Sequence, residues 1–259
     1  MLPVTTDEVK AFWEAHPLCS EAISWEPGTP EFFQEHERMR LDSEPAEVQA
    51  RLYEWRNYPG KRLLDIGCGT GYVAALYAKG GARVTAVDIA ERSVELTKKR
   101  LAWHGLDGDV RTSNAERLPF EDGVFDVVTS FGVLHHTPDT ARALLEVHRV
   151  LQTGGFTHLM FYHRNSFAYR VLFPLKRLLQ SAWRGKTAQD QVNAVDGMTN
   201  PLGKVFTRAD VMELMPGFTD FHFATWELFF HHAGRIPKPL RDFMARRWGW
   251  FLYVKARKS

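Results

Sequence analysis

The stretch that decides the fold is LLDIGCGTG, residues 63–71. An apolar run leads into Asp65, and glycine then occupies every second position, at 67, 69 and 71. Alternate glycines let the backbone turn tightly after a strand and approach a ligand closely, and the helix that follows offers unpaired N–H groups. A second strand-like run, RVTAVD at 83–88, ends in Asp88, where a carboxylate can accept hydrogen bonds from both hydroxyls of a ribose. The pattern predicts a nucleoside-containing ligand at the carboxyl ends of parallel strands.

Other glycine-rich loops fit this stretch less well. A phosphate-binding P-loop ends in Gly-Lys-Ser/Thr, which the sequence lacks, and a dinucleotide fingerprint has the spacing G-x-G-x-x-G rather than G-x-G-x-G. Asp65, two residues ahead of the first glycine, would repel a pyrophosphate but suits a ligand that carries an ammonium group. A tight turn that binds no ligand is the remaining alternative.

From residue 61 onward, short apolar runs bounded by glycine or aspartate alternate with helical patterns. This alternation is typical of a parallel sheet with helices on both faces. Strands are predicted at 62–66, 83–87, 109–112, 125–130 and 157–162, and helices at 72–79, 91–104 and 138–151. We therefore expect a doubly wound α/β fold.

The regions on either side of this core show different sequence patterns. Residues 1–58 favour helices, with Thr6 as an expected cap and Thr29-Pro30 as a second helix start. We expect a helical cap at 1–58 and one α/β domain at 59–259. Within that domain we expect an insertion at 163–206, a helix at 208–215, and strands at 220–230 and 250–256 that close the far edge of the sheet.

Four more sequence blocks follow the glycine loop in a familiar order. They are VDI at 87–89, NAERLPF at 114–120, FDVV with LHH at 125–136, and EVHRVL with GG at 146–155. Together with DIGCGTG they resemble the class I S-adenosylmethionine-dependent methyltransferases, across residues 60–162. The blocks are similar to those of the small-molecule branch that includes ubiquinone and menaquinone methyltransferases, with a methyltransferase type 11 domain.

The resemblance implies a Rossmann-like, mostly parallel seven-stranded sheet whose last strand is antiparallel. It also implies that the chain binds S-adenosylmethionine and releases S-adenosylhomocysteine. One position departs from the family pattern, because Asn114 stands where an aspartate is common; its carbonyl oxygen can still accept a hydrogen bond from the adenine amino group. The positions that the resemblance assigns to the donor are Arg40 for the methionine carboxylate, Asp65 for its ammonium group, Gly67, Cys68, Gly69 and Gly71 for close approach, Asp88 and Ile89 for the ribose, Asn114, Ala115 and Glu116 for the adenine, and Ser130 under the methionine portion.

Four polar residues are candidates for moving a proton, because a sulfonium is already an activated methyl donor and the protein has to align a nucleophile and remove one proton. His135 and His136 follow the fourth strand, and either can act as a base at neutral pH. The alternative is that one histidine caps the next helix and the other packs. Tyr162 and His163 end the fifth strand, where ligands gather in a doubly wound sheet.

The insertion begins with a basic stretch, because residues 164–186 contain six Lys or Arg and no acid. Apolar residues follow helical spacing there, with Pro174 expected to start or kink the helix. We expect this helix to cover the pocket as a lid. Simple packing on the core and binding to a membrane surface are the alternatives.

Composition and charge limit the partners and the location that we expect. The chain has 259 residues, a net charge of +2 and two cysteines, Cys19 and Cys68. The near-neutral charge disfavours nucleic acid as a partner, and the few cysteines, the missing signal peptide and the missing apolar span favour the cytoplasm. We expect a small-molecule acceptor, no functional metal, and a monomer or homodimer; the neighbouring His231 and His232 do not form a metal-binding pattern.

Overall fold

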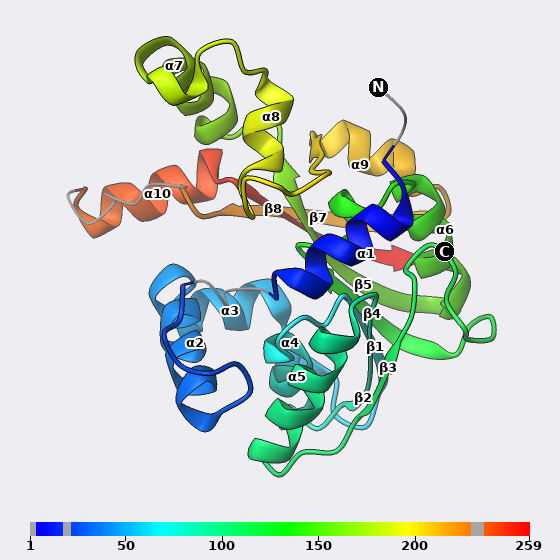
Figure 1. Cartoon of the computed structure of the whole chain (residues 1–259). Coiled ribbons are helices and arrows are strands. Elements are labelled where there is room, and N and C mark those ends of the chain that lie inside the picture. Colours follow the sequence, from blue (N-terminus) through cyan, green and yellow to red (C-terminus); the bar gives the residue numbers. More distant parts are fainter. Residues whose placement is uncertain (1–3, 18–21, 229–235) are drawn as a thin grey trace.

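The centre of the protein is a mostly parallel sheet, seen in a computed structural model that describes residues 4–17, 22–228 and 236–259 (Figure 1). Within these residues the sheet has eight strands. They are β1 (Arg62–Ile66), β2 (Arg83–Asp88), β3 (Asp109–Thr112), β4 (Phe125–Phe131), β5 (Leu151–His163), β6 (Val205–Phe206), β7 (Phe218–Trp226) and β8 (Phe251–Lys258).

The strand order, β3-β2-β1-β4-β5-β8-β7, carries the chain outward in both directions from β1. Strands β1 to β5 are parallel, and β8 runs antiparallel to both β5 and β7. Asp65 stands in register with Ala86 of β2 and Thr129 of β4, so the carboxyl ends of the three central strands lie together. The predicted doubly wound sheet with an antiparallel last strand is confirmed, and the two-residue β6 beside β5 is an addition to it.

Helices cover both faces of this sheet because neighbouring residues of each strand point to opposite sides. Leu63 belongs to a core under α3, α4, α5 and α10, whereas Leu64 belongs to a core under α6 and α9. These helices are α3 (Ala46–Tyr53), α4 (Tyr72–Lys79), α5 (Glu91–Trp103), α6 (Thr140–Val150), α9 (Arg208–Leu214) and α10 (Lys238–Trp248).

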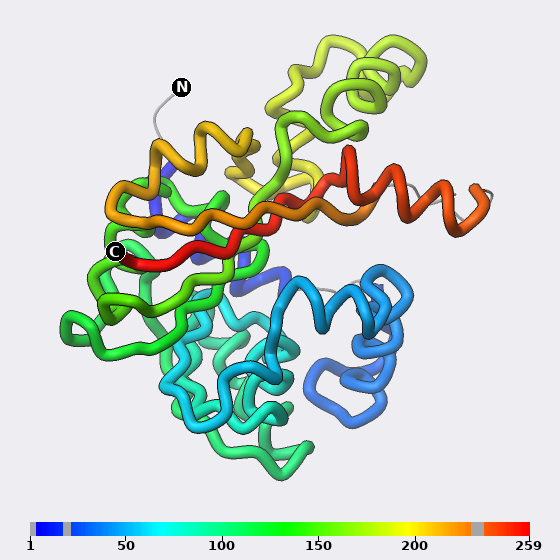
Figure 2. The backbone as a smooth tube through the Cα atoms, turned by 180° about the vertical axis from the view of Figure 1, so that it is seen from behind, coloured from blue at the N-terminus to red at the C-terminus, as the bar shows by residue number. Residues whose placement is uncertain are grey.

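Two further groups of helices lie outside these layers. At the N-terminal side, α1 (Thr6–Ala15) crosses in front of the sheet and α2 (Pro30–Ser43) stands beside α3, and the short η1 (Trp55–Asn57) leads into β1 (Figure 1). After β5 the chain forms η3 (Ala168–Leu172), α7 (Phe173–Leu179), η4 (Ser181–Trp183) and α8 (Ala188–Asn193). Seen from behind, these elements and α10 project from the same side of the molecule (Figure 2).

The predicted core elements agree with the structure to within a few residues, except that β5 begins at Leu151 rather than at residue 157. The cap of α1 is Thr5 and not Thr6, because the Thr5 hydroxyl accepts from Glu8 N–H in a capping box. Thr29 caps α2 as predicted. Helix α10 lies between the two strands predicted at 220–230 and 250–256, where no helix was predicted. Residues 229–230 of the predicted strand end lie outside the described residues. Cys19, His231 and His232 lie outside them as well.

Candidate active site

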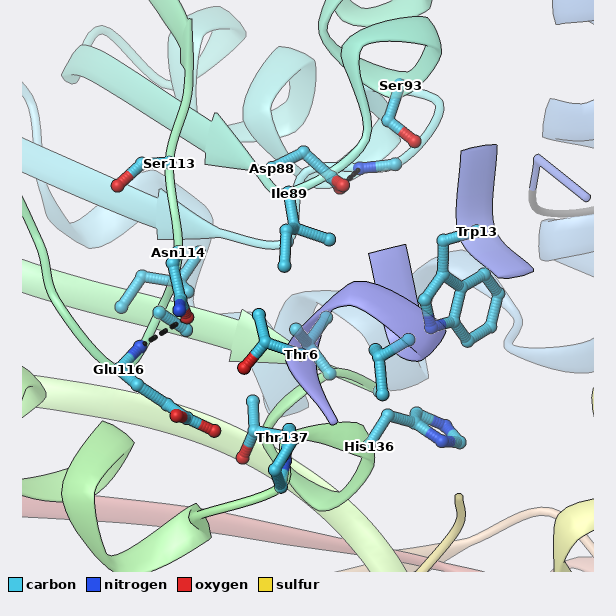
Figure 3. A pocket seen from close by; sticks show the side chains of 18 of the residues that line it. Thr6, Trp13, Asp88, Ile89, Ser93, Ser113, Asn114, Glu116, His136 and Thr137 are labelled. Atoms are coloured by element: carbon cyan, nitrogen blue, oxygen red, sulfur yellow. Dashed lines mark hydrogen bonds between the residues drawn. The ribbon is translucent and has the colours of Figure 1, made fainter. Parts of the chain in front are cut away.

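A pocket opens where β1, β2 and β4 end. One side is formed by strand ends and turns of the core, and the other by α1 and the exit of β4 (Figure 3). The lining residues are Thr6, Val9, Trp13, Ile66, Gly67, Gly69, Asp88, Ile89, Ser93, Ser113, Asn114, Ala115, Glu116, Phe131, Gly132, Val133, His136, Thr137 and Pro138. The pocket therefore joins the predicted donor-binding residues to one of the two predicted histidines.

The glycine loop needs glycine for two different reasons. Gly67 has φ +75° and lies so close to β4's exit that a Cβ there would be 2.2 Å from Cγ2 of Val133. Gly69 has φ +52°, and a Cβ there would meet no atom within 4 Å, which leaves the space above it open to a ligand. At Gly71, with φ +77°, the neighbour is Thr97 of α5, so this glycine serves packing between the loop and a helix. The loop thus combines tight packing beneath with an open surface above.

A fully buried arginine holds this loop from below. The Nε of Arg100 donates to Thr70 O over 2.7 Å, and its Nη1 lies 2.9 Å from Glu37 of α2. The guanidinium also lies 4.4 Å from the ring centre of Phe33. Burial and the neighbouring cations lower the pKa of His36 to about 2, so this ring is neutral where it meets Arg100 and Thr70. Helix α2 is therefore connected to the glycine loop through a buried charge.

Two buried acids lie at the ends of β1 and β2, and of the two Asp88 lines the pocket. Asp88 accepts from Gly69 N–H and Ala90 N–H, each over 2.9 Å, and burial raises its pKa to about 6. Asp65 accepts from Thr129 through Oδ1, whereas its buried Oδ2 has no hydrogen-bond partner. Burial raises the pKa of Asp65 to about 7. A buried acceptor without a donor is costly unless a ligand supplies one, so Asp65 suits the ammonium group that the sequence assigned to it.

The adenine end is formed by the turn after β3. Asn114 Oδ1 accepts from Glu116 N–H over 2.9 Å, so the oxygen that the sequence assigned to the adenine amino group also closes a local turn (Figure 3). Ala115 is buried beside it, and Glu116 accepts from Asp139 N–H at the start of α6. These contacts fix the turn, and Asn114, Ala115 and Glu116 all line the pocket.

Helix α1 forms one wall of the pocket. Thr6, Val9 and Trp13 line the pocket at spacings of three and four residues, the helical periodicity that was available in the sequence as a signal. Glu14 follows on the same helix, and its carboxylate accepts from Glu91 N–H and Arg92 N–H. Since the N-cap residue of α5 makes no side-chain cap, Glu14 caps α5 from another helix and thereby holds α1 over the pocket.

The two histidines after β4 have different surroundings. His135 is completely buried between His136 and Tyr162, and burial lowers its pKa well below the usual range. His136 lines the pocket beside Trp13, with the two ring centres 5.3 Å apart. Its Nδ1 lies 2.5 Å from Leu202 O, and its Nε2 lies 3.3 Å from Oδ2 of Asp196. Asp196 was not singled out from the sequence, since a lone aspartate in an insertion gives no recognisable pattern.

The other predicted site residues lie around the pocket without lining it. Arg40 pairs with the buried Glu44 over 2.8 Å and donates to Tyr53 over 2.6 Å. Its guanidinium is therefore engaged in a polar cluster beside Phe131. Ser130 donates to Ile66 O, and Cys68 is buried within the loop. Tyr162 donates to Asp196, whereas His163 lies 3.1 Å from Gly249 O. Of the predicted donor residues, the lining set is Gly67, Gly69, Asp88, Ile89, Asn114, Ala115 and Glu116.

The basic segment after β5 does not form the expected lid. Among the described residues, none from 164–206 lines the pocket. Several apolar residues of this segment are exposed, Leu178 by 77% and Leu179 by 70%, with Val171 and Leu175 also exposed. Phe173 is the buried residue of α7, and it packs on Trp250. The helical spacing was real, but its apolar face points to solvent.

Two features of the described residues bear on other kinds of site. No group of three or more His, Cys, Asp or Glu side chains there is arranged to hold a metal ion. None of the described helices has the length and apolar character that crossing a bilayer requires.

Comparison with known proteins supports the same family. Residues 64–159 match the family described as "Methyltransferase domain". The chain is 38% identical over 111 residues to the ubiquinone biosynthesis O-methyltransferase of Pseudomonas aeruginosa strain UCBPP-PA14, which covers 42% of this chain and 48% of that one. It is 37% identical over 175 residues to the Pseudomonas paraeruginosa enzyme of the same name, covering 60% and 75% of the two chains. The chain thus spans about half the length of the first of these curated relatives.

Solved structures agree on the fold. A SAM-dependent methyltransferase from Thermotoga maritima superposes with a TM-score of 0.60 at 22% identity, covering 88% of this chain and 96% of that one. One from Aquifex aeolicus gives a TM-score of 0.55 at 15% identity, covering 91% and 100%. The fold is that of a Rossmann-like protein with a pocket at the carboxyl ends of its parallel strands. The chain belongs to the class I S-adenosylmethionine-dependent methyltransferase family.

Proposed function

We propose that this chain transfers the methyl group of S-adenosylmethionine to a hydroxyl group of a small molecule. The observation that carries the proposal is the continuous pocket in which the glycine loop, Asp88 and Asn114 meet His136. The choice of an oxygen acceptor rests on the two Pseudomonas relatives, which are both named O-methyltransferases. We also propose that the protein is located in the cytoplasm, and this proposal rests on its composition alone.

The residues present fit the donor. Gly67 and Gly69 admit its methionine part, Asp88 accepts from the ribose hydroxyls, and Asn114 with Ala115 contacts the adenine. The orphaned Oδ2 of Asp65 offers a charge and a hydrogen-bond acceptor to the ammonium group. When bound, the donor supplies an activated methyl group on a positively charged sulfur, so the chain itself has to provide alignment and a proton acceptor.

His136 is the proposed proton acceptor, because it is the one of the four predicted catalytic residues that lines the pocket. The acceptor is proposed to bind beside Trp13 and His136, on the side of the pocket away from Asn114 (Figure 3). A half-buried tryptophan at that position suits a planar or lipophilic acceptor. His135, which is buried and neutral, is proposed to support the ring of His136.

Calorimetry and a transfer assay test this function separately. S-adenosylhomocysteine is expected to bind the wild-type chain, and Asp88→Ala is expected to weaken binding at least about tenfold by removing a charge-assisted ribose contact. Glu121→Ala, an exposed acid outside the pocket, is the matched control. Methyl-labelled donor is then supplied with catechol, phenol and aliphatic alcohols, and labelled ether is the expected product.

The outcomes separate the alternatives. Binding with no labelled product from any hydroxyl compound would favour a catalytically silent donor-binding protein. Product only with amines, thiols or carbon acids would refute the oxygen assignment. No binding of S-adenosylhomocysteine would refute the proposal as a whole.

A second proposal concerns the segment 164–186, which we define as the basic segment. We propose that it binds an anionic lipid surface. Four apolar side chains of the segment are exposed: Val171, Leu175, Leu178 and Leu179. In the described part of the chain Arg170, Arg184 and Lys186 make no ion pair with a carboxylate, and the segment itself contains no acid. Exposed apolar groups next to unneutralised cations favour the interface of an anionic membrane.

Vesicle sedimentation tests this surface. The chain is expected to sediment with vesicles that contain 30% phosphatidylglycerol, and to lose this binding in high salt or in a Leu178→Ser/Leu179→Ser double variant. Equal binding to vesicles of phosphatidylcholine alone, or no binding to either, would contradict an anionic lipid as the partner.

A further inference from the structure

Helix α1 lies over the pocket, and its apolar side chains face the pocket or the insertion. Val9 and Trp13 line the pocket together with Thr6. Phe12 is buried on the side of the insertion, where its Cζ lies 3.3 Å from the place that a Cβ would take on Gly197. Figure 3 shows Thr6 and Trp13 at different points along the pocket. Helix α1 therefore spans the pocket between the sheet domain and the insertion.

Glu14 joins this helix to the start of α5. Its carboxylate accepts from Glu91 N–H over 2.8 Å and from Arg92 N–H over 3.2 Å. Lys10, one turn earlier on α1, lies 3.7 Å from the Glu91 carboxylate. Ala90, the N-cap residue of α5, has no side-chain acceptor to offer to these N–H groups. The first turn of α5 therefore depends on an acceptor that another helix supplies.

The same turn of the chain holds the acid that was assigned to the ribose. Asp88 Oδ1 accepts from Ala90 N–H and Oδ2 accepts from Gly69 N–H, each over 2.9 Å. The N–H groups of residues 90, 91 and 92 are thus shared between Asp88, on the donor side, and Glu14, on α1. If α1 left its place, two N–H groups of the turn next to Asp88 would lose their acceptor.

The structure assigns to Glu14 the role of a positioning residue that couples the docking of α1 to donor binding. This inference rests on the proposed binding of S-adenosylmethionine. A nucleoside placed between Asp88 and Asn114 lies beneath α1, so the bound donor adds buried surface that keeps the helix in place. Release of the donor then requires α1 to separate from α5, and Glu14 sets how often this happens.

The other polar contacts of α1 do not replace Glu14. The pair of Lys10 and Glu91 is long, and its side chains are 41% and 70% exposed, so water weakens it. The capping box at the start of α1 stabilises the helix itself and joins it to no neighbour. The Trp13 ring meets His136 edge-on, with ring centres 5.3 Å apart, on the opposite side of the pocket from α5. Glu14 therefore provides the short contacts between α1 and α5.

The rate at which S-adenosylhomocysteine leaves the whole chain tests the inference without an acceptor. The chain is loaded with tritiated S-adenosylhomocysteine, chased with unlabelled ligand and sampled by rapid filtration. Glu14→Ala is expected to speed release at least about fivefold, because a helix start loses its acceptor. Glu95→Ala, at an exposed acid of α5, is the matched control and should leave release unchanged. Equal release rates in Glu14→Ala and the wild type would overturn the inference.

A double-mutant cycle with Trp13 asks whether Glu14 acts through α1. In Trp13→Ala the helix covers less of the donor, so its docking matters less for release. Adding Glu14→Ala to this variant is expected to speed release by less than about twofold. The full fivefold effect in both backgrounds would show that Glu14 acts independently of the helix that it belongs to, and the inference would be wrong.

A second change separates the positioning of α1 from the stability of α5. The backbone of Ala90 is extended, with φ −89° and ψ 125°, as an N-cap residue requires, so Ala90→Ser can supply a cap from α5's own chain. The variant Glu14→Ala/Ala90→Ser is expected to regain the melting temperature that Glu14→Ala loses, yet to keep its fast release. Release at the wild-type rate in this variant would mean that Glu14 serves only α5, contrary to the inference.

Amide hydrogen exchange distinguishes this inference from the proposed function. S-adenosylhomocysteine is expected to slow exchange in α1 of the wild type, and Glu14→Ala is expected to speed it in the ligand-free chain. Binding without any added protection of α1 would overturn the inference and leave the proposed function intact. If S-adenosylhomocysteine does not bind the wild type, the proposed function is wrong and the coupling fails with it. Exchange in ligand-free Glu14→Ala then still decides whether Glu14 holds α1.

Discussion

The two sides of the pocket are built in different ways. The donor side consists of strand ends and tight turns, where Gly67, Asp88 and Asn114 are fixed by main-chain hydrogen bonds or by close packing. The opposite side consists of helix α1, which is positioned by side-chain contacts of Glu14, and of the exit of β4, where His136 lies beside Asp196 of the insertion.

This difference separates residues that tolerate little substitution from residues that can change. Gly67 and Gly71 leave little room for substitution, because a Cβ there would meet Val133 or the main chain of Thr97. Helices outside the sheet keep their fold through their own caps and cores, so their pocket-facing residues can change at small cost in stability. We expect donor binding to be most sensitive to the first side, and acceptor choice to depend on the second.

The largest effect is expected at Gly67. A Cβ there would lie 2.2 Å from Val133 Cγ2 on a backbone with φ +75°, so Gly67→Ala combines overpacking with left-handed strain. Together these cost about 2–5 kcal/mol, equivalent to at least about 30-fold in S-adenosylhomocysteine affinity. Calorimetry measures the change. Gly60→Ala, at φ +73° with no atom within 4 Å of its Cβ, has the strain without the clash and should retain binding.

A smaller loss is expected from the helical side. Trp13→Ala removes the half-buried indole that lines the pocket beside His136, and we expect about tenfold weaker binding of S-adenosylhomocysteine from about 1–2 kcal/mol of lost burial. Trp25→Ala, at a tryptophan that is 56% exposed, is the control. If Trp13→Ala binds S-adenosylhomocysteine as tightly as the wild type does, α1 is no part of the donor site. The contrast between the two sides of the pocket then becomes sharper.

The buried acids predict a pH dependence of donor binding. The pKa of Asp65 is about 7 and that of Asp88 about 6, because burial disfavours their charged forms. Since an ammonium group binds the ionised carboxylate, S-adenosylhomocysteine affinity should fall as pH drops through 7, by up to about tenfold per unit. The ligand-free protein should show the opposite trend, losing stability as pH rises from about 4 to 7, because the folded pKa values lie above those of the unfolded chain.

Asp65→Asn checks the origin of this dependence. Its affinity at pH 8 should be lower than that of the wild type, and it should vary less between pH 8 and pH 6. A profile identical to that of the wild type would show that Asp65 does not meet the ligand.

The smallest effect is expected in the basic segment. Leu178→Ser/Leu179→Ser should change the free energy of unfolding by less than about 0.5 kcal/mol, since both side chains are already in water. Phe173→Ser, on the same helix but 2% exposed, should cost about 3 kcal/mol or more. Urea denaturation compares the two. A large loss in the leucine variant would mean that these residues pack on the core after all.

The donor side was largely predictable from sequence. The bounds of β1, β3 and α4 agree with those expected from apolar runs and glycines, because strands buried on both faces leave a nearly continuous apolar signal. Asp88 follows the second strand and lines the pocket as the spacing indicated.

The helical side was less predictable for physical reasons. The apolar spacing at 171–179 identifies a helix with one apolar face, but periodicity does not say whether that face meets the core or solvent. Asp196 reaches His136 across 60 residues of sequence through a loop, and nothing local marks such a contact. Arg40 was assigned to the donor, yet its charge is engaged by Glu44, a partner four residues away that helical spacing alone brings into reach.

The buried Arg100 limits how far the α/β domain can be shortened from its N-terminal side. It belongs to α5 of the sheet domain, whereas Glu37 and Phe33, which neutralise and cover it, belong to α2. A fragment that starts at residue 59 would expose this guanidinium or leave it without its counter-charge directly under the glycine loop. The N-terminal helices are thus a foundation of the donor loop, and a transplanted methyltransferase core of this kind would need either α2 or a neutral replacement at position 100.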